Sequence, residues 1–208
     1  MTSDTTYFGL LRHAETVWNR QNRIQGRLDS PLTETGIETH RRWGAFLASP
    51  VWSWDRIICS PSPRTQQSAH IINESLGVAI ETVEGIREQH WGRWEGLTME
   101  EILATYHDML RLGEQNGWDF TPPAGESRST VLERVSDALT SCAERHPGER
   151  ILVISHQGVI KSLIYTIENR RFLPDEPKLI EKNRLHTITL RNGSFCADQY
   201  NIGLPEAG

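Results

Sequence analysis

Short apolar runs that alternate with helix-like segments are the feature that most constrains the fold of this chain. The runs at 7–11, 56–59 and 151–154 are too short for helices, and their continuous apolar character is typical of buried strands. A segment with helical spacing of apolar residues follows each run. Alternating strands and helices predict an α/β fold, with a mostly parallel sheet and helices packed on both faces.

Further elements complete a predicted three-layer α/β/α sandwich. Residues 79–83 are typical of a short strand, and the sequences at 98–101 and 130–133 fit capping boxes that begin two more helices. Near the end of the chain, Asn192-Gly193 separates two alternating segments, which predicts an antiparallel hairpin at the edge of the sheet. Because the chain has no repeat, linker or low-complexity tract, we expect residues 1–208 to form a single domain.

Composition argues against several classes of partner. The 208 residues include 22 Lys and Arg against 27 Asp and Glu, and this net charge of −5 gives no reason to expect nucleic acid or an anionic membrane. No apolar run approaches the roughly 20 residues that cross a bilayer. Cys59, Cys142 and Cys196 are odd in number and widely spaced, which disfavours a disulfide scaffold or a zinc ribbon. We therefore expect a cytoplasmic protein. Its oligomeric state is left open, a homodimer included.

Cationic and imidazole side chains follow the three central strands of the predicted sheet. Arg12 and His13 come after the first strand, Arg64 lies shortly after the second, and His156 follows the third. Because ligands bind outside the carboxyl ends of parallel strands, we expect these side chains to converge at one edge. Two guanidiniums and two imidazoles beside helix N-termini form an anion site suited to phosphate.

Ordered motifs connect the chain to a known family. Six blocks occur in one order along nearly the whole chain: Arg12-His13-Ala14-Glu15-Thr16 with Trp18-Asn19, the segment 25–36, Ser60-Pro-x-x-Arg64-Thr65, Glu88 with Trp91-Gly-x-Trp-Glu-Gly96, Gly125-Glu126-Ser127, and Ser155-His156-x-Gly158. Together they resemble the signature of the histidine phosphatase family, also called the phosphoglycerate mutase-like family. A lone Arg-His pair means little, whereas six ordered blocks are very hard to obtain by chance.

The resemblance implies a covalent phosphohistidine mechanism, with a small phosphorylated substrate and neither a metal nor another cofactor. His13 is the expected nucleophile and Glu88 the expected proton donor. Arg12, Arg64 and His156 are expected to hold the phosphoryl oxygens. Further substrate contacts are expected from Asn19, Gln25, Gly26, Trp91 and Gln157.

Some neighbours of these residues have an expected supporting role. Trp91 and Trp94 are expected to raise the pKa of Glu88 by excluding water from its carboxyl group. Glu126 either pairs with an arginine or only begins the next helix, and the sequence does not separate these two interpretations.

The segment between Glu88 and Gly125 favours a phosphatase over a mutase. Mutase members of the family hold the carboxylate of phosphoglycerate with extra basic residues, typically paired arginines, inserted in this segment. Here the only arginines are Arg93 and Arg111, and Trp91 stands where a mutase has tyrosine. We therefore interpret the chain as a histidine acid-type phosphatase that hydrolyses a phosphomonoester. A bisphosphoglycerate-dependent phosphoglycerate mutase is the main alternative, followed by a non-catalytic phosphate-binding protein.

Overall fold

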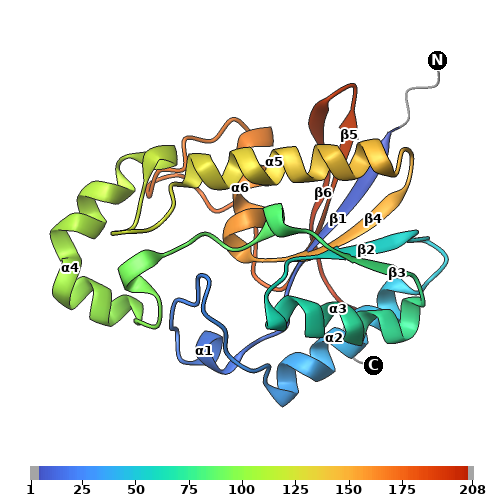
Figure 1. The fold of residues 1–208 in the computed structure, drawn as a ribbon, viewed down its shortest axis with the longest axis horizontal. Helices are drawn as coiled ribbons and strands as arrows, with labels where there is room; N and C mark the ends of the chain where they lie inside the picture. Colours follow the sequence, from blue (N-terminus) through green and yellow to red (C-terminus); the bar gives the residue numbers. More distant parts are fainter. Residues whose placement is uncertain (1–4, 206–208) are drawn as a thin grey trace.

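The computed structural model describes residues 5–205, which form a mixed sheet of six strands with helices on both faces (Figure 1). The strands are β1 (Thr6–Arg12), β2 (Arg56–Cys59), β3 (Ala79–Thr82), β4 (Arg150–Ser155), β5 (Leu185–Arg191) and β6 (Ser194–Ile202). Their order across the sheet is β3-β2-β4-β1-β5-β6. The first four in this order run parallel, and β5 runs antiparallel to both of its neighbours.

Helices cover the sheet on both sides. The α-helices are α1 (Val17–Arg20), α2 (Glu34–Leu47), α3 (Pro63–Leu76), α4 (Met99–Glu114), α5 (Arg128–Arg145) and α6 (Gln157–Ile167), and the 3₁₀ helices are η1 (Glu84–Ile86), η2 (Gly92–Trp94) and η3 (Gly117–Asp119). Helices α2 and α3 pack on one face of the sheet, and α5 and α6 pack on the other (Figure 1). The predicted three-layer α/β/α fold is confirmed.

The continuous apolar run of β4 is explained by the two faces of the sheet. Ile151 and Val153 lie in the core that α5 and α6 cover, while Leu152 and Ile154 lie in the core that α2 and α3 cover. All four side chains are at most 1% exposed. Burial of apolar surface is the main favourable term in folding, and close packing fixes the positions of the strand ends.

Of the two predicted capping boxes, one is confirmed and one is wrong. At the start of α4, the Thr98 hydroxyl accepts from the Glu101 N–H, and the Glu101 carboxylate accepts from the Thr98 N–H. Helix α5 begins earlier than predicted, because Ser127 is its N-cap and accepts from the Thr130 N–H at 3.1 Å. Thr130 therefore lies inside the first turn, where its backbone donor is already satisfied.

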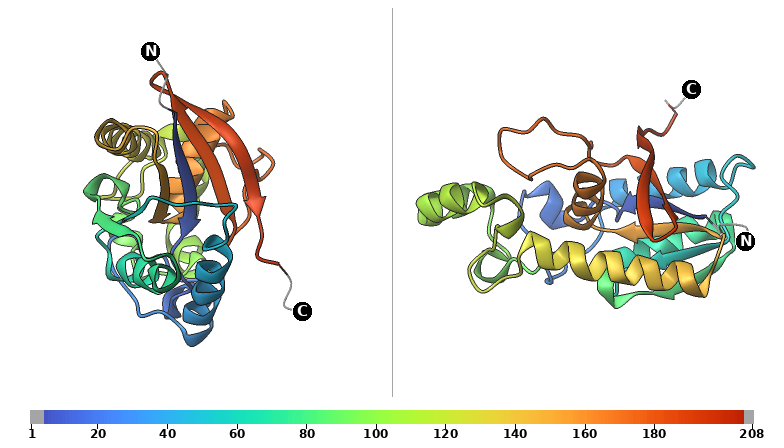
Figure 2. Two further views of the ribbon diagram at one scale, coloured as in Figure 1. Left: turned by 90° about the vertical axis from the view of Figure 1, so that its right-hand side faces the viewer. Right: turned by 90° about the horizontal axis from the view of Figure 1, so that it is seen from above.

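The C-terminal hairpin is confirmed. Asn192 and Gly193 have φ angles of 51° and 75°, so both adopt the left-handed conformation of a two-residue type I′ turn. Strand β5 pairs with β1, and β6 forms the edge of the sheet (Figure 2). The strand predicted at 79–83 is also confirmed, as β3 at the opposite edge.

Helix α4 lies away from the sheet, beyond the carboxyl ends of the parallel strands (Figure 1). A third apolar cluster, formed by Trp94, Ile102, Leu110 and Phe120, attaches it to the rest of the molecule. Trp91 packs on this cluster, so the segment that carries it is held near the sheet edge. Within residues 5–205, no helix is both long and apolar enough to cross a membrane.

Truncation of Leu152 tests the packing of the α2–α3 core. Leu152→Ala removes a fully buried side chain from central strand β4, and we expect the free energy of unfolding to fall by about 2–5 kcal/mol. Leu112→Ala is the control, because Leu112 is 63% exposed, and it should change this free energy by less than about 0.5 kcal/mol. Urea unfolding followed by circular dichroism measures both. Equal effects of the two substitutions would contradict the packing.

Candidate active site

The three central parallel strands end side by side, and the predicted site residues begin there. His13 follows β1, and its N–H donates to the Ser155 carbonyl at 2.9 Å. Ser60 follows β2, and its N–H donates to the Ile154 carbonyl at 3.2 Å. These bonds extend the parallel ladders past the strand ends and place His13, Ser60 and His156 at one edge of the sheet.

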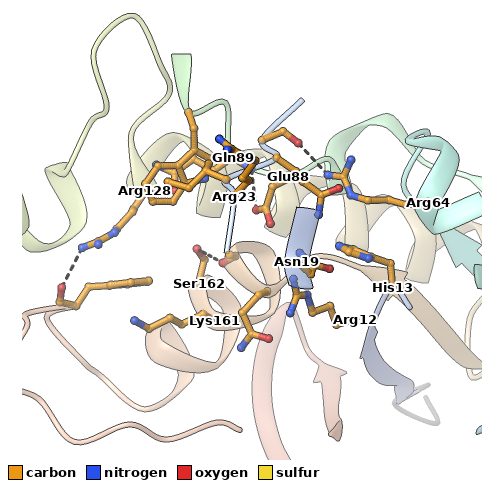
Figure 3. Close-up of a pocket in the computed structure, with 17 residues that line it drawn as sticks. Arg12, His13, Asn19, Arg23, Arg64, Glu88, Gln89, Arg128, Lys161 and Ser162 are labelled. Carbon is orange, nitrogen blue, oxygen red and sulfur yellow. Dashed lines mark hydrogen bonds between the residues drawn. The ribbon is translucent and has the colours of Figure 1, made fainter. Parts of the chain in front are cut away.

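A cavity of about 290 Å³ opens at this edge (Figure 3). Nine of the ten predicted site residues line this cavity. They are Arg12, His13, Asn19, Gln25, Gly26, Arg64, Glu88, Trp91 and Gln157. The exception, His156, is fully buried next to the cavity, with its ring centroid 5.4 Å from that of His13. The structure therefore brings the predicted residues together from four separate parts of the chain: residues 12–26, Arg64, residues 88–91 and residues 156–157.

His13 is held neutral with one ring nitrogen free. Burial, followed by the charges of Arg12 and Arg64, lowers the pKa of His13 well below its ordinary value. The ring Nδ1 lies 2.7 Å from the Ala14 carbonyl oxygen, and because a carbonyl can only accept, Nδ1 carries the proton. Nε2 is then unprotonated and can act as a nucleophile.

Arg64 is fixed by the loop that follows α1. Its Nη1 donates to the Leu28 carbonyl at 2.8 Å and to the Asp29 carboxylate at 2.9 Å. Its Nη2 donates to the Gly26 carbonyl at 2.8 Å. The Nε atom is buried without a hydrogen-bond partner. Since an unpaired buried donor is costly, it indicates a position where an oxygen of a ligand can bind.

Arg12 supplies a second guanidinium with an unpaired donor. Its Nε is also buried without a partner. Burial lowers the pKa of Arg12, and the nearby charge of Glu88 opposes that shift. Two buried guanidiniums facing one cavity favour an anionic ligand. In the described part of the chain, no cluster of His, Cys, Asp and Glu side chains is suited to hold a metal ion.

His156 contacts the guanidinium of Arg64. Its Nδ1 accepts from Nη2 of Arg64 at 3.3 Å, so its proton lies on Nε2, which is 2.8 Å from the Ser60 hydroxyl oxygen. Burial, followed by the charge of Arg64, lowers the pKa of His156 well below its ordinary value. Both ring nitrogens therefore have protein partners. A phosphoryl oxygen can accept from this ring only at Nε2, where it would replace the Ser60 hydroxyl.

The carboxyl group of Glu88 faces the cavity (Figure 3). Burial raises the pKa of Glu88, although the Gln89 N–H, 2.9 Å from Oε1, and the two guanidiniums oppose that shift. Gly158, near the start of α6, lies directly against this group. A Cβ at Gly158 would come within 2.5 Å of Oε1, so a side chain at this position would displace the carboxyl group.

Of the two tryptophans predicted to lie beside Glu88, only Trp91 does so. Trp91 lines the cavity together with Glu88. Trp94 does not line it. Instead, its ring is buried, with centroids 6.0 Å from those of Tyr106 and Phe120. The expectation that Trp94 shields Glu88 is therefore wrong, because this ring is part of the cluster that attaches α4.

Glu126 pairs with an arginine, the first of its two open interpretations. Its carboxylate accepts from Nε and Nη2 of Arg134 at 2.7 and 2.9 Å. Arg134 also donates to the backbone carbonyls of Gly85, Arg87 and Glu88, at distances of 2.7 to 3.2 Å. Because these carbonyls belong to the segment that leads to Glu88, the ion pair holds that segment in place.

Asn19 directs its amide nitrogen to the cavity because its oxygen is used in a helix cap. Thr16 is the N-cap of α1, and its N–H donates to Oδ1 of Asn19 at 3.2 Å. The Asn19 N–H donates to the Thr16 hydroxyl at the same distance, which completes a capping box. With its oxygen engaged, the Asn19 side chain offers its nitrogen as a donor to an anion.

Gln25 and Gly26 line the cavity from the loop after α1. Gly26 has a φ of +53°, and a Cβ there would meet the Glu95 carboxylate at 2.2 Å, so only glycine fits. The Gly26 carbonyl is one of the acceptors that fix Arg64. The loop is therefore part of the support of the anion site.

Four charged or aromatic lining residues were not predicted: Arg23, Arg128, Lys161 and Phe172. Lys161 lies one turn after Gln157 on α6, so helical spacing alone could have placed it at the cavity. The sequence points less clearly to Arg128. A cation in the first turn of a helix interacts unfavourably with the helix dipole, and this unusual position is the only sequence sign of a functional role for Arg128. The sequence-based comparison with mutases considered only the basic residues of segment 88–125. Arg128 and Lys161 lie outside that segment and also contribute positive charge to the cavity.

Comparison with known proteins agrees with this geometry. The sequence profile of the histidine phosphatase superfamily (branch 1) matches residues 8–201. The chain belongs to this superfamily. The resemblance stated from the six sequence blocks is thereby confirmed.

Similar members of the histidine phosphatase superfamily have phosphatase or mutase-like names. "Uncharacterized phosphatase PhoE" of Bacillus subtilis is 30% identical over 193 residues, which are 93% of this chain and 90% of that protein. Phosphoglycerate mutase-like protein 4 of Arabidopsis thaliana is 33% identical over 156 residues, 74% of this chain and 67% of that protein. The solved structure of YhfR from Bacillus stearothermophilus has a TM-score of 0.85 at 31% identity, covering 95% and 97% of the two chains. Family membership thus supports an enzyme of the phosphatase or mutase type.

Replacement of Gly158 tests the contact between α6 and Glu88. In Gly158→Ala the new methyl group requires the Glu88 carboxyl to move, so we expect kcat/KM for a phosphomonoester to fall about tenfold or more. The free energy of unfolding should not fall by more than about 1 kcal/mol, because alanine favours the helix. Steady-state kinetics and urea unfolding measure the two effects. Wild-type kcat/KM in the variant would show that Glu88 does not act from this position.

Proposed function

We propose that the chain is one histidine phosphatase domain over residues 1–208, which hydrolyses a small phosphorylated metabolite through a phosphohistidine. The observation that carries this proposal is the neutral, buried His13 with Nε2 free beside the guanidiniums of Arg12 and Arg64. A neutral imidazole is a nucleophile, and buried cations beside it favour a phosphoryl group. The three unpaired cysteines are compatible with the expected cytoplasmic location.

In the proposed first step, Nε2 of His13 attacks phosphorus in line with the leaving oxygen. An N–P bond forms as the ester O–P bond breaks. Arg12, Arg64 and the Asn19 amide bind the equatorial oxygens, over which charge is spread in the transition state. Glu88, whose pKa is raised by burial, gives its proton to the leaving alkoxide.

In the proposed second step, water cleaves the phosphohistidine. Glu88, now ionised, takes a proton from the water, whose oxygen attacks phosphorus as the N–P bond breaks. The products are inorganic phosphate and the original His13. His156 orients Arg64 through their 3.3 Å contact, and its Nε2–H donates to a phosphoryl oxygen where that oxygen replaces the Ser60 hydroxyl.

A bisphosphoglycerate-dependent phosphoglycerate mutase is the second candidate. One observation favours it: Arg128 and Lys161 give the cavity the extra cations that segment 88–125 lacks. The two functions share the step on His13 and differ in the group that receives the phosphoryl from it. Assays with an aryl phosphate and with 3-phosphoglycerate separate them. Phosphate release supports the phosphatase, and fast isomerisation with negligible hydrolysis would identify the mutase.

Removal of the His13 imidazole tests the nucleophile. His13→Ala should lower kcat for an aryl phosphate by about a thousandfold or more, because the N–P bond can no longer form. His107→Ala is the control, since His107 is exposed on α4, and it should retain wild-type kcat. Circular dichroism checks that both variants fold. Wild-type turnover by His13→Ala would reject the assignment, and a wild-type protein that turns over no phosphomonoester would favour a non-catalytic phosphate-binding protein.

Replacement of Glu88 tests the proton donor. Glu88→Gln keeps the size of the side chain but has no carboxyl proton, so kcat/KM for an alkyl phosphate should fall about 10²–10⁴-fold. An aryl phosphate should lose less, because its leaving group is stable without protonation. Since burial raises the pKa of Glu88, wild-type kcat/KM for the alkyl phosphate should fall as pH rises through that raised pKa. Equal losses with both substrates would contradict the assignment.

A further inference from the structure

The end of the cavity away from His13 contains two cations that the proposed chemistry does not use. Figure 3 shows Arg128 and Lys161 on one side of the cavity, and His13 with Arg12 and Arg64 on the other. Arg128 is at the start of α5, and Lys161 lies on α6. Two separate helices therefore bring positive charge to the same end of the cavity.

Neither cation is paired with a carboxylate among the residues that the structure describes. Arg128 donates instead to the backbone carbonyls of Gly117 and Phe172, at 2.9 and 3.0 Å. Lys161 Nζ forms no hydrogen bond with residues 5–205. Arg23, another cation that lines the cavity, differs because a carboxylate lies 3.0 Å from its Nη1. The charges of Arg128 and Lys161 are therefore available to a ligand.

Aromatic rings hold both cations in place. The Phe172 ring centroid lies 4.2 Å from Cζ of Arg128 and 4.3 Å from Nζ of Lys161. Phe120 contacts Arg128 from a second direction, at 4.4 Å, and Tyr165 contacts Lys161 at 4.7 Å. Phe172 itself has a φ of +66°, which is strained for a bulky residue. Strain of this kind is concentrated at functional sites, where the surrounding structure imposes it.

The two charges are costly as they stand. Burial, followed by the charge of Arg128, lowers the pKa of Lys161 to about 8, and burial lowers the pKa of Arg128 to about 10. An anion bound between them would stabilise both charged forms. Buried, shifted groups that face a cavity are typical of binding sites.

We propose that Arg128 and Lys161 form a second anion site, which binds a carboxylate or a second phosphate of the substrate. This inference rests on the proposed function, in which the phosphomonoester of the same molecule lies at His13. Arg128 and Lys161 line the same cavity as His13 and lie across it (Figure 3), so the two anionic groups belong to opposite ends of one bound molecule. A cavity of about 290 Å³ fits such a compact metabolite. The phosphate ester of a neutral alcohol would leave both cations unpaired.

Three substrates that differ at one end test this site. Glycerol 3-phosphate, 3-phosphoglycerate and glycerol 1,3-bisphosphate carry a hydroxymethyl, a carboxylate and a phosphate-bearing methylene group at the end away from the reacting ester. In the wild type, we expect kcat/KM for at least one of the two substrates with a second anionic group to exceed that for glycerol 3-phosphate by about tenfold or more. The substrate that shows this preference identifies the second group as carboxylate or phosphate.

Substitution of Lys161 assigns the preference to this site. The preference is the ratio of kcat/KM for the preferred substrate to kcat/KM for glycerol 3-phosphate. Lys161→Met should reduce this ratio by about tenfold, whereas Lys161→Arg should retain it. Lys182→Met is the matched control, because Lys182 is an exposed lysine outside the cavity, and it should keep the wild-type ratio. A wild type without a preference, or a ratio that Lys161→Met leaves unchanged, would overturn the second site while leaving the phosphatase in place.

The pH dependence of the preference gives a second readout. Around Lys161, Arg128 and Lys178 lower its pKa further, while Glu114 and Glu176 raise it. Lysine is charged only below its pKa, so the preference for 3-phosphoglycerate over glycerol 3-phosphate should decline above about pH 8 in the wild type. It should persist to higher pH in Lys161→Arg, because arginine stays protonated. A wild-type preference that is constant through this range would contradict the role of Lys161.

Failure of the proposed function has a different signature. If the wild type hydrolyses neither these three compounds nor an aryl phosphate, the phosphatase proposal fails. Calorimetric binding of 3-phosphoglycerate and glycerol 3-phosphate then tests the second site without turnover. A Kd that is about tenfold lower for 3-phosphoglycerate, and a preference that Lys161→Met removes, would support the site. Equal Kd values would overturn it.

Discussion

The site depends on the electrostatic interaction between two guanidiniums and the neutral imidazole beside them. Arg12 and Arg64 each keep an Nε donor buried and unpaired, and their charges help to hold His13 in its uncharged form. The same charges that disfavour a proton on His13 favour a phosphoryl group next to it. In the proposed function, the nucleophile and the anion site therefore arise from one electrostatic arrangement.

The rest of the fold stabilises the buried charges of this arrangement and holds its residues in position. Parallel strands packed on both faces fix the backbone at His13 and His156, and the carbonyls of the 26–28 loop satisfy the other donors of Arg64. The Glu126–Arg134 pair holds the backbone that carries Glu88, and Gly158 allows α6 to approach the Glu88 carboxyl group. Most of these contacts are to backbone atoms, so the geometry depends on the path of the chain as much as on the side chains.

Sequence reasoning predicted the parts of this structure that depend on local patterns. The strands, the helix cap at Thr98 and the turn at Asn192-Gly193 all follow from short-range preferences and are confirmed. The rule that ligands bind at the carboxyl ends of parallel strands also predicted that the arginines and histidines lie at one edge of the sheet. The orientation of the Trp94 ring and the cations at the far end of the cavity were missed, because both depend on packing between segments distant in sequence. Arg128 and Lys161 meet only because α5 and α6 cover the same face of the sheet.

The charge and tautomer of His13 test the central claim most directly. Long-range ¹H–¹⁵N correlation NMR on the free wild-type protein reports both, with His13→Gln used to assign the signals. A neutral ring with its proton on Nδ1 is expected at pH 7, and this form should persist as pH falls through the ordinary histidine pKa of about 6.5. A ring that is charged at pH 7, or a neutral ring with its proton on Nε2, would contradict a nucleophile held ready by two buried arginines.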